Sequence, residues 1–302
     1  MDRHRWPPSG SQWAVAGVVV ALAAAALVYR AAQDTGLADT AVLFVGLPAV
    51  LALVVALTPK ARSVTGMAMK ATTIGLLLSM FFFGEGMVCI LMAAPLFYAV
   101  AGLIGWSADR ARKPGQLRVW VVVPLVLALM STEGVTEMTT LPRAGQATVT
   151  RTVAAGAADV ERALAQPPRL GGRLPAFLQL GFPRPLRAAG SGLAVGDVRV
   201  IDFSRHARHY AHHHGTLVMK VTERGLGRAV FTVAGDTTPM ASWQAWRSAE
   251  VTWRETAPGM TSVTWTIAYD RLLDPGWYFG PMERYANTLA AGYLIDAAAT
   301  PA

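Results

Sequence analysis

The stretch TSVTWTIAYDRLLDPGWYFGPMERYANTLAAGYLIDAAA, residues 261–299, places a strand-like pattern before a helix-like one. In its first part, large apolar residues alternate with small polar ones, which is typical of a β-strand buried on one face: Val263, Trp265, Ile267 and Tyr269. Asp274-Pro275-Gly276 predicts a turn, and Pro281 fits the first turn of a helix. Larger residues then recur at helical spacing and predict a face that packs on a sheet: Met282, Tyr285, Leu289, Tyr293 and Asp296.

The residues before this stretch predict further strands of the same sheet. Strand-like segments occupy residues 146–155, 197–203, 216–223, 228–235 and 249–256, in addition to 262–269. The connections RGLG (224–227) and APGMT (257–261) are short, which favours antiparallel hairpins. GAADVERALAQPP (156–168) predicts a short helix, and residues 169–196 predict a loop with a second short helix or a lid. Residues 141–302 therefore predict an α+β domain, in which a curved antiparallel sheet wraps a long C-terminal helix.

Three segments of this domain resemble a known superfamily. They are TVTRTVAAGAADVERALA (148–165), GLAVGDVRVIDF (192–203) and the strand–turn–helix stretch quoted first. Residues 146–298 resemble the helix-grip fold of the START/polyketide-cyclase-like superfamily (SRPBCC). The resemblance implies a deep apolar cavity between the sheet and the last helix, which binds lipids, polyketides or other hydrophobic small molecules. Some members are enzymes and many only bind or carry, and the superfamily has no universal catalytic motif, so no catalytic residue is carried over.

Sheet and helix periodicity select four residues as candidates for the wall of such a cavity. Trp253 and Trp265 fall on the apolar face of their strands, and Tyr285 and Leu289 fall on the predicted inner face of the helix. We expect these four to contact a hydrophobic ligand. The alternative is that these aromatics form an ordinary core or lie at a membrane interface.

The first 140 residues have a different composition. The whole chain is 53% hydrophobic and only 15% charged, with mean hydropathy +0.36, and the apolar excess lies before about residue 140. Apolar runs predict about five transmembrane helices at residues 13–30, 40–58, 67–83, 87–106 and 117–132. This membrane region matches no recognised family.

The segment FFFGEGMVCILMAAP (81–95) decides the number of spans, because Glu85 interrupts a long apolar run. The flanking glycines favour a tight turn between two helices. Basic residues concentrate in alternate connections, which predicts a cytoplasmic N-terminus and an extracytoplasmic C-terminal domain at the cell (inner) membrane. Glu85, Glu133 and Glu137 are either solvated groups at headgroup level or a proton- or cation-linked site.

Five of the six histidines lie in HARHYAHHHG: His206, His209, His212, His213 and His214. Imidazole binds transition metals, so His209, His212 and His214 are candidate ligands. The run contains no carboxylate to orient the rings, and Arg205 and Arg208 would repel a cation. We therefore predict a solvated loop, with no metal and no cofactor. The single cysteine, Cys89, excludes an internal disulfide, and no nucleophile motif or phosphate-binding loop occurs.

These observations predict an integral membrane protein whose extracytoplasmic domain binds a hydrophobic small molecule or lipid, for sensing, carrying or hand-off. The expected partners are the bilayer, that ligand and a membrane protein. The basic residues are scattered, which does not favour nucleic-acid binding despite a net charge of +8. Two alternatives remain: an enzyme acting on a lipid- or polyketide-like substrate, and a non-catalytic regulatory subunit of a membrane complex.

Overall fold

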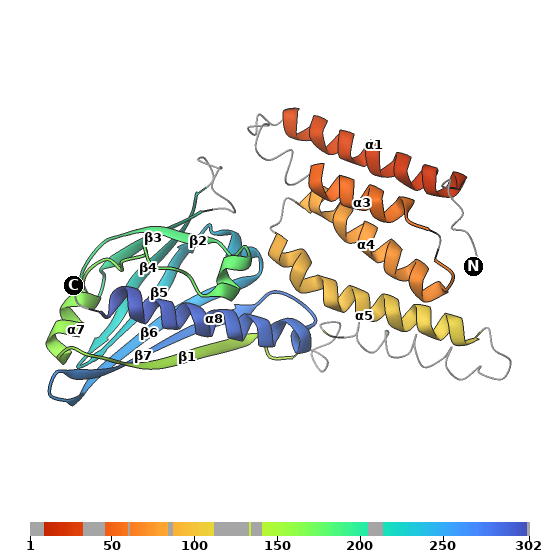
Figure 1. The fold of residues 1–302 in the computed structure, drawn as a ribbon. Coiled ribbons are helices and arrows are strands. Elements are labelled where there is room, and N and C mark those ends of the chain that lie inside the picture. The colour runs from red at the N-terminus through yellow and green to blue at the C-terminus, as the bar shows by residue number, and fades with distance from the viewer. Residues whose placement is uncertain are drawn as a thin grey trace. The chain divides into compact units, whose positions relative to one another are not determined.

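The computed structural model describes residues 9–32, 46–59, 61–83, 87–111, 133, 141–204 and 214–300. It divides into two compact units, Met1–Met130 and Ser131–Ala302, so the division falls ten residues before the boundary set at residue 140. Figure 1 shows helices in the first unit and a sheet with a long helix in the second.

The first unit contains four described helices: α1 (Gly10–Ala32), α3 (Leu47–Leu57), α4 (Val64–Phe83) and α5 (Met87–Ala111). Helices α4 and α5 pack antiparallel, because Asp109 near the end of α5 caps the start of α4. The Asp109 carboxylate accepts the backbone N–H groups of Val64 at 2.7 Å and Thr65 at 3.0 Å. A Cβ on Gly105 would lie 2.4 Å from the Thr65 backbone, so glycine permits this close approach.

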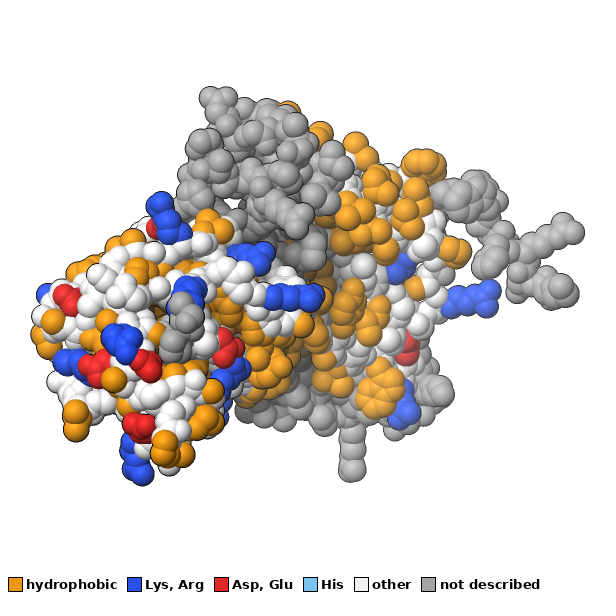
Figure 2. Space-filling view, turned by 60° about the vertical axis from the view of Figure 1, so that its left-hand side comes forward, with side chains coloured by type: hydrophobic (Ala, Val, Ile, Leu, Met, Phe, Trp, Pro, Cys, Tyr) orange, Lys and Arg blue, Asp and Glu red, His pale blue; other side chains and the backbone are white. Residues whose placement is uncertain are grey.

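Two of these helices are long and apolar enough to cross a membrane, within Gly10–Val28 and Ile90–Arg110. Leu47–Leu57 and Val64–Ser79 are shorter apolar helices. The expectation of about five spans is therefore not confirmed, and residues 112–132, which include the fifth, lie outside the described residues, as does Glu85. Large apolar side chains are exposed on α1, α3, α4 and α5 (Figure 2), which is unusual for a surface that meets water.

The second unit is a seven-stranded antiparallel sheet in the order β1-β7-β6-β5-β4-β3-β2. Helix α8 lies across one face of the curved sheet (Figure 1). The strands are β1 (Ala144–Val153), β2 (Arg184–Ala189), β3 (Val198–Ser204), β4 (His214–Gly225), β5 (Arg228–Asp236), β6 (Gln244–Ala257) and β7 (Met260–Arg271). The helical elements are α7 (Ala157–Leu164), η3 (Ala176–Leu180), η4 (Pro239–Ser242) and α8 (Gly276–Ala298). This arrangement is the predicted α+β helix-grip fold.

The alternation in β7 works as the sequence predicts. Val263, Trp265 and Ile267 are buried beneath the helices. Thr264 and Thr266 lie on the outer face, where their hydroxyls bond to Thr150 at 2.8 Å and Thr148 at 3.0 Å in β1. The hairpin turns RGLG and APGMT are confirmed, and Gly227 and Gly259 supply the positive φ angles that such turns require.

Two predictions about this unit are wrong in detail. Strand β2 is absent from the predicted strands, because its sequence RPLRAA contains a proline and lacks alternation; it is an edge strand, where proline is tolerated. Helix α8 begins at Gly276, so Pro281 lies inside it. Its buried side differs in part from the predicted face: Tyr293 is buried as predicted, whereas Tyr285 is exposed. The other buried residues include Phe279, Glu283, Ala286, Asn287, Ala291 and Ile295. Because many of the buried residues are small or polar, the buried face shows only a weak hydrophobic periodicity.

Candidate functional site

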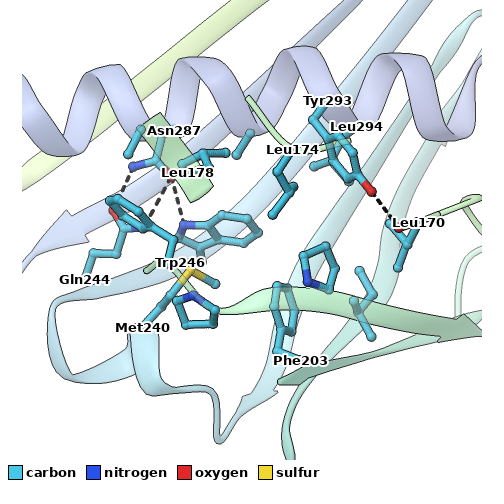
Figure 3. A pocket seen from close by; sticks show the side chains of 16 residues that line it. Leu170, Leu174, Leu178, Phe203, Met240, Gln244, Trp246, Asn287, Tyr293 and Leu294 are labelled. Carbon is cyan, nitrogen blue, oxygen red and sulfur yellow. Dashed lines mark hydrogen bonds between the residues drawn. The ribbon is translucent and has the colours of Figure 1, made fainter. Parts of the chain in front are cut away.

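An apolar cavity of about 60 Å³ lies between α8, the sheet and the chain that precedes β2. Sixteen residues from α8, β2, β3, β6, η3, η4 and the adjoining loops line it (Figure 3): Leu170, Leu174, Leu178, Phe182, Pro183, Pro185, Ile201, Phe203, Met240, Gln244, Trp246, Ala286, Asn287, Ala290, Tyr293 and Leu294. None of these side chains is ionisable except that of Tyr293. The cavity is therefore suited to hydrocarbon.

Three polar side chains meet at one end of the cavity and satisfy one another. Asn287 Nδ2 donates to Gln244 Oε1 at 2.7 Å and to the backbone oxygen of Glu283 at 2.9 Å. Asn287 Oδ1 accepts from Trp246 Nε1 at 2.9 Å and from Gln244 Nε2 at 3.4 Å. Asn287 thus uses both of its donors and both lone pairs inside the protein. We call Asn287, Gln244 and Trp246 the polar floor.

The last polar group in the cavity wall is also occupied. The Tyr293 hydroxyl donates to the backbone oxygen of Leu170 at 2.8 Å, and this bond ties α8 to the segment before η3 (Figure 3). Burial raises the pKa of Tyr293 above its ordinary value, so the phenol stays protonated. A ligand that brought a polar group into this cavity would leave that group without a partner, at a cost of about 1–3 kcal/mol.

The four residues predicted to bind ligand lie elsewhere. Trp253 and Trp265 are buried on the inner face of the sheet, and the Arg224 guanidinium lies 4.8 Å from the Trp253 ring. Tyr285 is 53% exposed, with its ring 5.1 Å from that of Phe177. Neither these three nor Leu289 is among the sixteen residues that line the cavity. A ligand contact by any of them stays a prediction.

One sequence feature that indicates the cavity lies outside the predicted strands and long helix. Leu170, Leu174 and Leu178 recur every fourth residue within a segment rich in proline and glycine, and all three point into the cavity (Figure 3). Gln244 and Asn287 gave no signal, because a buried amide is recognised only when its partner is known.

A second buried polar group lies at the other end of α8. Arg271 is 4% exposed and donates to the carboxylates of Asp274 and, at 3.3 Å, Glu133. Glu133 also accepts the backbone N–H of Gly276 at 2.7 Å and so caps the start of α8. This contact connects Glu133 to the fold and gives it a structural role beside the two roles considered from the sequence.

Glu283 is the unpaired member of this charged group. Both of its carboxyl oxygens are buried and have no hydrogen-bond partner among the described residues. Burial raises the pKa of Glu283 to about 8, although Arg271 acts in the opposite direction. Glu283 is therefore mostly a neutral acid at pH 7.

The histidine run offers no described site. Residues 205–213 lie outside the described residues, and only the backbone of His214 is placed, at the start of β4. In the described part of the chain, no group of three or more His, Cys, Asp or Glu side chains is arranged to hold a metal ion.

No family model matches the chain, and no curated protein matches it. The fold of the C-terminal half is similar to several solved structures, each of which covers about half of this chain. TTHA0849 from Thermus thermophilus is 10% identical over 50% of this chain and 92% of its own, with a TM-score of 0.33. Major latex-like protein 151 from Panax ginseng is 15% identical over 50% and 99%, with a TM-score of 0.28. Zhui aromatase/cyclase from Streptomyces sp. R1128 is 19% identical over 51% and 85%, with a TM-score of 0.31.

At these identities and TM-scores the similarity concerns the fold alone. A shared fold does not determine function, which depends on the residues of the cavity itself.

Proposed function

We propose that the C-terminal unit binds the hydrocarbon part of a small molecule or lipid in the cavity beside α8. The observation that carries this proposal is the chemistry of the wall: an apolar lining whose few polar groups are already paired with one another. Such a wall favours a hydrocarbon chain over a hydroxylated or ionised ligand, because it offers no free partner for a buried polar group.

The size of the cavity limits what enters without a rearrangement. A water molecule needs about 10–15 Å³ of such space, so 60 Å³ accommodates about five methylene-sized groups. At about 0.8 kcal/mol per buried methylene, these contribute about 4 kcal/mol, which corresponds to millimolar affinity. Micromolar binding of a longer chain therefore requires the segment around η3 to move away from α8.

We further propose that the first unit anchors this domain at the inner membrane, with about five spans, a cytoplasmic N-terminus and an extracytoplasmic C-terminal unit. The exposed apolar surfaces of α1 and α5 support the membrane part, and the distribution of basic residues supports the orientation. The test is labelling of intact cells by an impermeant thiol reagent at Leu226→Cys in a Cys89→Ser chain. Leu226 is fully exposed in the β4–β5 turn. Labelling only after lysis would place the domain in the cytoplasm.

Ligand binding is tested with a fluorescent fatty acid, cis-parinaric acid, added to the full-length protein in detergent. Ala290→Leu fills the cavity from α8 and should lower probe affinity at least tenfold. Thr288→Leu places the same leucine side chain on the same helix outside the lining and should not lower it. Equal affinities in both variants would place the probe elsewhere. A wild-type protein that binds no apolar probe would instead favour a non-catalytic subunit whose cavity is filled by its own side chains.

A further inference from the structure

The segment that covers the cavity has an unusual charge composition. Residues 169–187, RLGGRLPAFLQLGFPRPLR, contain four arginines and no acid, and no Asp or Glu occurs between Glu161 and Asp197. We call residues 169–187 the covering segment. The covering segment therefore carries a charge of +4, whereas the net charge of the whole chain is +8. None of these arginines lines the cavity, so closing the cavity does not account for the positive charge of the segment.

The covering segment runs alongside α8 in the opposite direction. The Arg169 backbone N–H donates to the Ala297 oxygen at 2.8 Å, and the Phe177 ring lies 5.1 Å from the ring of Tyr285. Its inner side chains, Leu170, Leu174 and Leu178, are buried in the cavity wall. Arg169, Arg173 and Leu180 lie between or beyond them and are exposed. The inner leucines and the outer arginines therefore belong to opposite sides of one segment.

The outer side combines positive charge with exposed apolar groups. Arg169, Arg173 and Arg184 form no ion pair with any described residue, whereas Arg187 pairs with Asp202 at 2.9 Å. Leu180 is 49% exposed, Leu186 48% and Tyr285, beside Phe177, 53%. Single exposed apolar side chains are common on protein surfaces, so the distinctive feature here is their position beside these arginines.

We infer that the covering segment docks on an anionic lipid bilayer, with Arg169, Arg173 and Arg184 at the headgroups and Leu180 and Tyr285 inserted at the acyl boundary. Positive charge with adjacent apolar side chains is complementary to such a surface. The same chain contains two helices long and apolar enough to span a membrane, and such spans would keep a bilayer available to the covering segment. This inference rests on the proposed function only for the presence of the membrane.

Docking would deepen the proposed function, because the cover of the cavity would lie at the source of hydrocarbon chains. Leu174 and Leu178 close the cavity from the same segment whose outer side contacts lipid. Displacement of this segment toward the bilayer would open the space that a longer chain needs. The ligand class is then a membrane acyl chain.

The test uses the full-length Cys89→Ser chain with Leu180→Cys labelled with the NBD fluorophore, reconstituted into phosphatidylcholine vesicles with and without phosphatidylglycerol. Lipids with a quencher on the acyl chain report insertion. A matched chain carries the label at Thr150→Cys, an exposed position on the outer face of the sheet. We expect stronger quenching at residue 180 than at residue 150, and only in vesicles with phosphatidylglycerol.

The arginines are tested by the triple variant Arg169→Gln, Arg173→Gln and Arg184→Gln. Each arginine near a charged surface contributes about fivefold to membrane affinity, so the variant should lose the anionic-lipid-dependent quenching, as should high salt in the wild-type protein. Equal quenching at residues 180 and 150 would overturn the inference. Quenching that is the same with and without phosphatidylglycerol would also overturn it, because the contact would then be apolar only.

The parinaric acid assay separates this inference from the proposed function. The triple variant should bind the probe in detergent as the wild-type protein does, since none of the three arginines lines the cavity. Normal probe binding without anionic-lipid-dependent quenching rejects docking and keeps the cavity function. Normal quenching in a wild-type protein that binds no probe supports docking and rejects the cavity function.

Discussion

The two halves of α8 contact the rest of the domain in opposite ways. Its first half lies beside Arg271, Glu133 and Asp274, which are joined by ion pairs and by the cap on Gly276. Its second half, from Ala286 to Leu294, borders an apolar cavity that is closed by leucines of the covering segment. Charged groups with specific partners fix one position of the helix, whereas a few apolar contacts leave room for a ligand. The domain therefore combines a fixed end and an adaptable end on one helix.

Removing Arg271 should break the fixed end and gives the largest expected effect. Arg271→Ala would leave the buried Glu133 carboxylate without its cation, whereas Asp274 keeps its ion pair with Arg143 at 2.9 Å. We expect a loss of about 3–5 kcal/mol in the free energy of unfolding. Chemical denaturation followed by tryptophan fluorescence measures this change.

Arg247→Ala is the matched control, because Arg247 pairs with Asp270 at the surface at 3.4 Å and should contribute less than about 1 kcal/mol. If Arg271→Ala destabilises the protein no more than Arg247→Ala, the charged end does not fix α8.

Glu283 should make the fixed end sensitive to pH. Its pKa of about 8 in the folded protein lies above the ordinary 4.5, so between these values the folded state binds more protons than the unfolded state. The free energy of unfolding should therefore fall as pH rises from 5 to 8, by at most about 1.4 kcal/mol per unit. Glu283→Gln, which cannot ionise, should show a flatter profile and a higher stability at pH 9.

Melting temperatures measured by circular dichroism across this range test the effect, with the exposed Glu255→Gln as control. Parallel profiles for the wild-type protein and Glu283→Gln would mean that Glu283 ionises as easily in the folded state as in the unfolded one.

The architecture of the domain was largely predictable from the sequence, because it depends on local patterns. Alternation in β7 and the turns around Gly227 and Gly259 follow from residues that are neighbours in the chain. The start of α8 did not follow, because its cap is Glu133, 143 residues before Gly276, rather than a residue beside it. Long-range capping leaves no trace in the sequence around a helix terminus.

The site was less predictable, for a physical reason. The inner side of α8 carries Glu283, Ala286 and Asn287 as well as large apolar residues, so apolar residues alone do not mark the buried face. The polar floor pairs Asn287 with a residue 43 positions earlier, Gln244, and such a pairing becomes visible only after folding. Trp253 and Trp265 were correctly assigned to the inner face, but sheet periodicity alone does not say which part of that face is left unfilled.

The polar floor lies between the two ends of α8, and Asn287 is its centre. Asn287→Ala would remove four hydrogen bonds and leave Gln244 and Trp246 Nε1 with buried, unsatisfied groups. We expect a loss of about 2 kcal/mol in the free energy of unfolding, because these groups lose their partners. The loss is no larger because the enlarged cavity can admit a water molecule that bonds to them. The same variant should bind parinaric acid more weakly, as the wall becomes polar. Unchanged stability and affinity would show that the hydrogen bonds of the polar floor contribute neither to the stability of the domain nor to the apolar character of the cavity.

Trp246→Phe tests the boundary with the smallest change. It removes one N–H donor to Asn287 Oδ1 but keeps an aromatic ring in the wall, and Asn287 keeps its bonds to Gln244. We expect a loss of about 1 kcal/mol or less in the free energy of unfolding and nearly unchanged probe affinity. Circular dichroism is the suitable measurement, since the substitution removes a fluorophore. A loss as large as that of Asn287→Ala would mean that Trp246 contributes as much stability to the polar floor as Asn287 does. The boundary between the fixed end and the cavity would then depend on the indole of Trp246 in β6 rather than on the amide of Asn287 in α8.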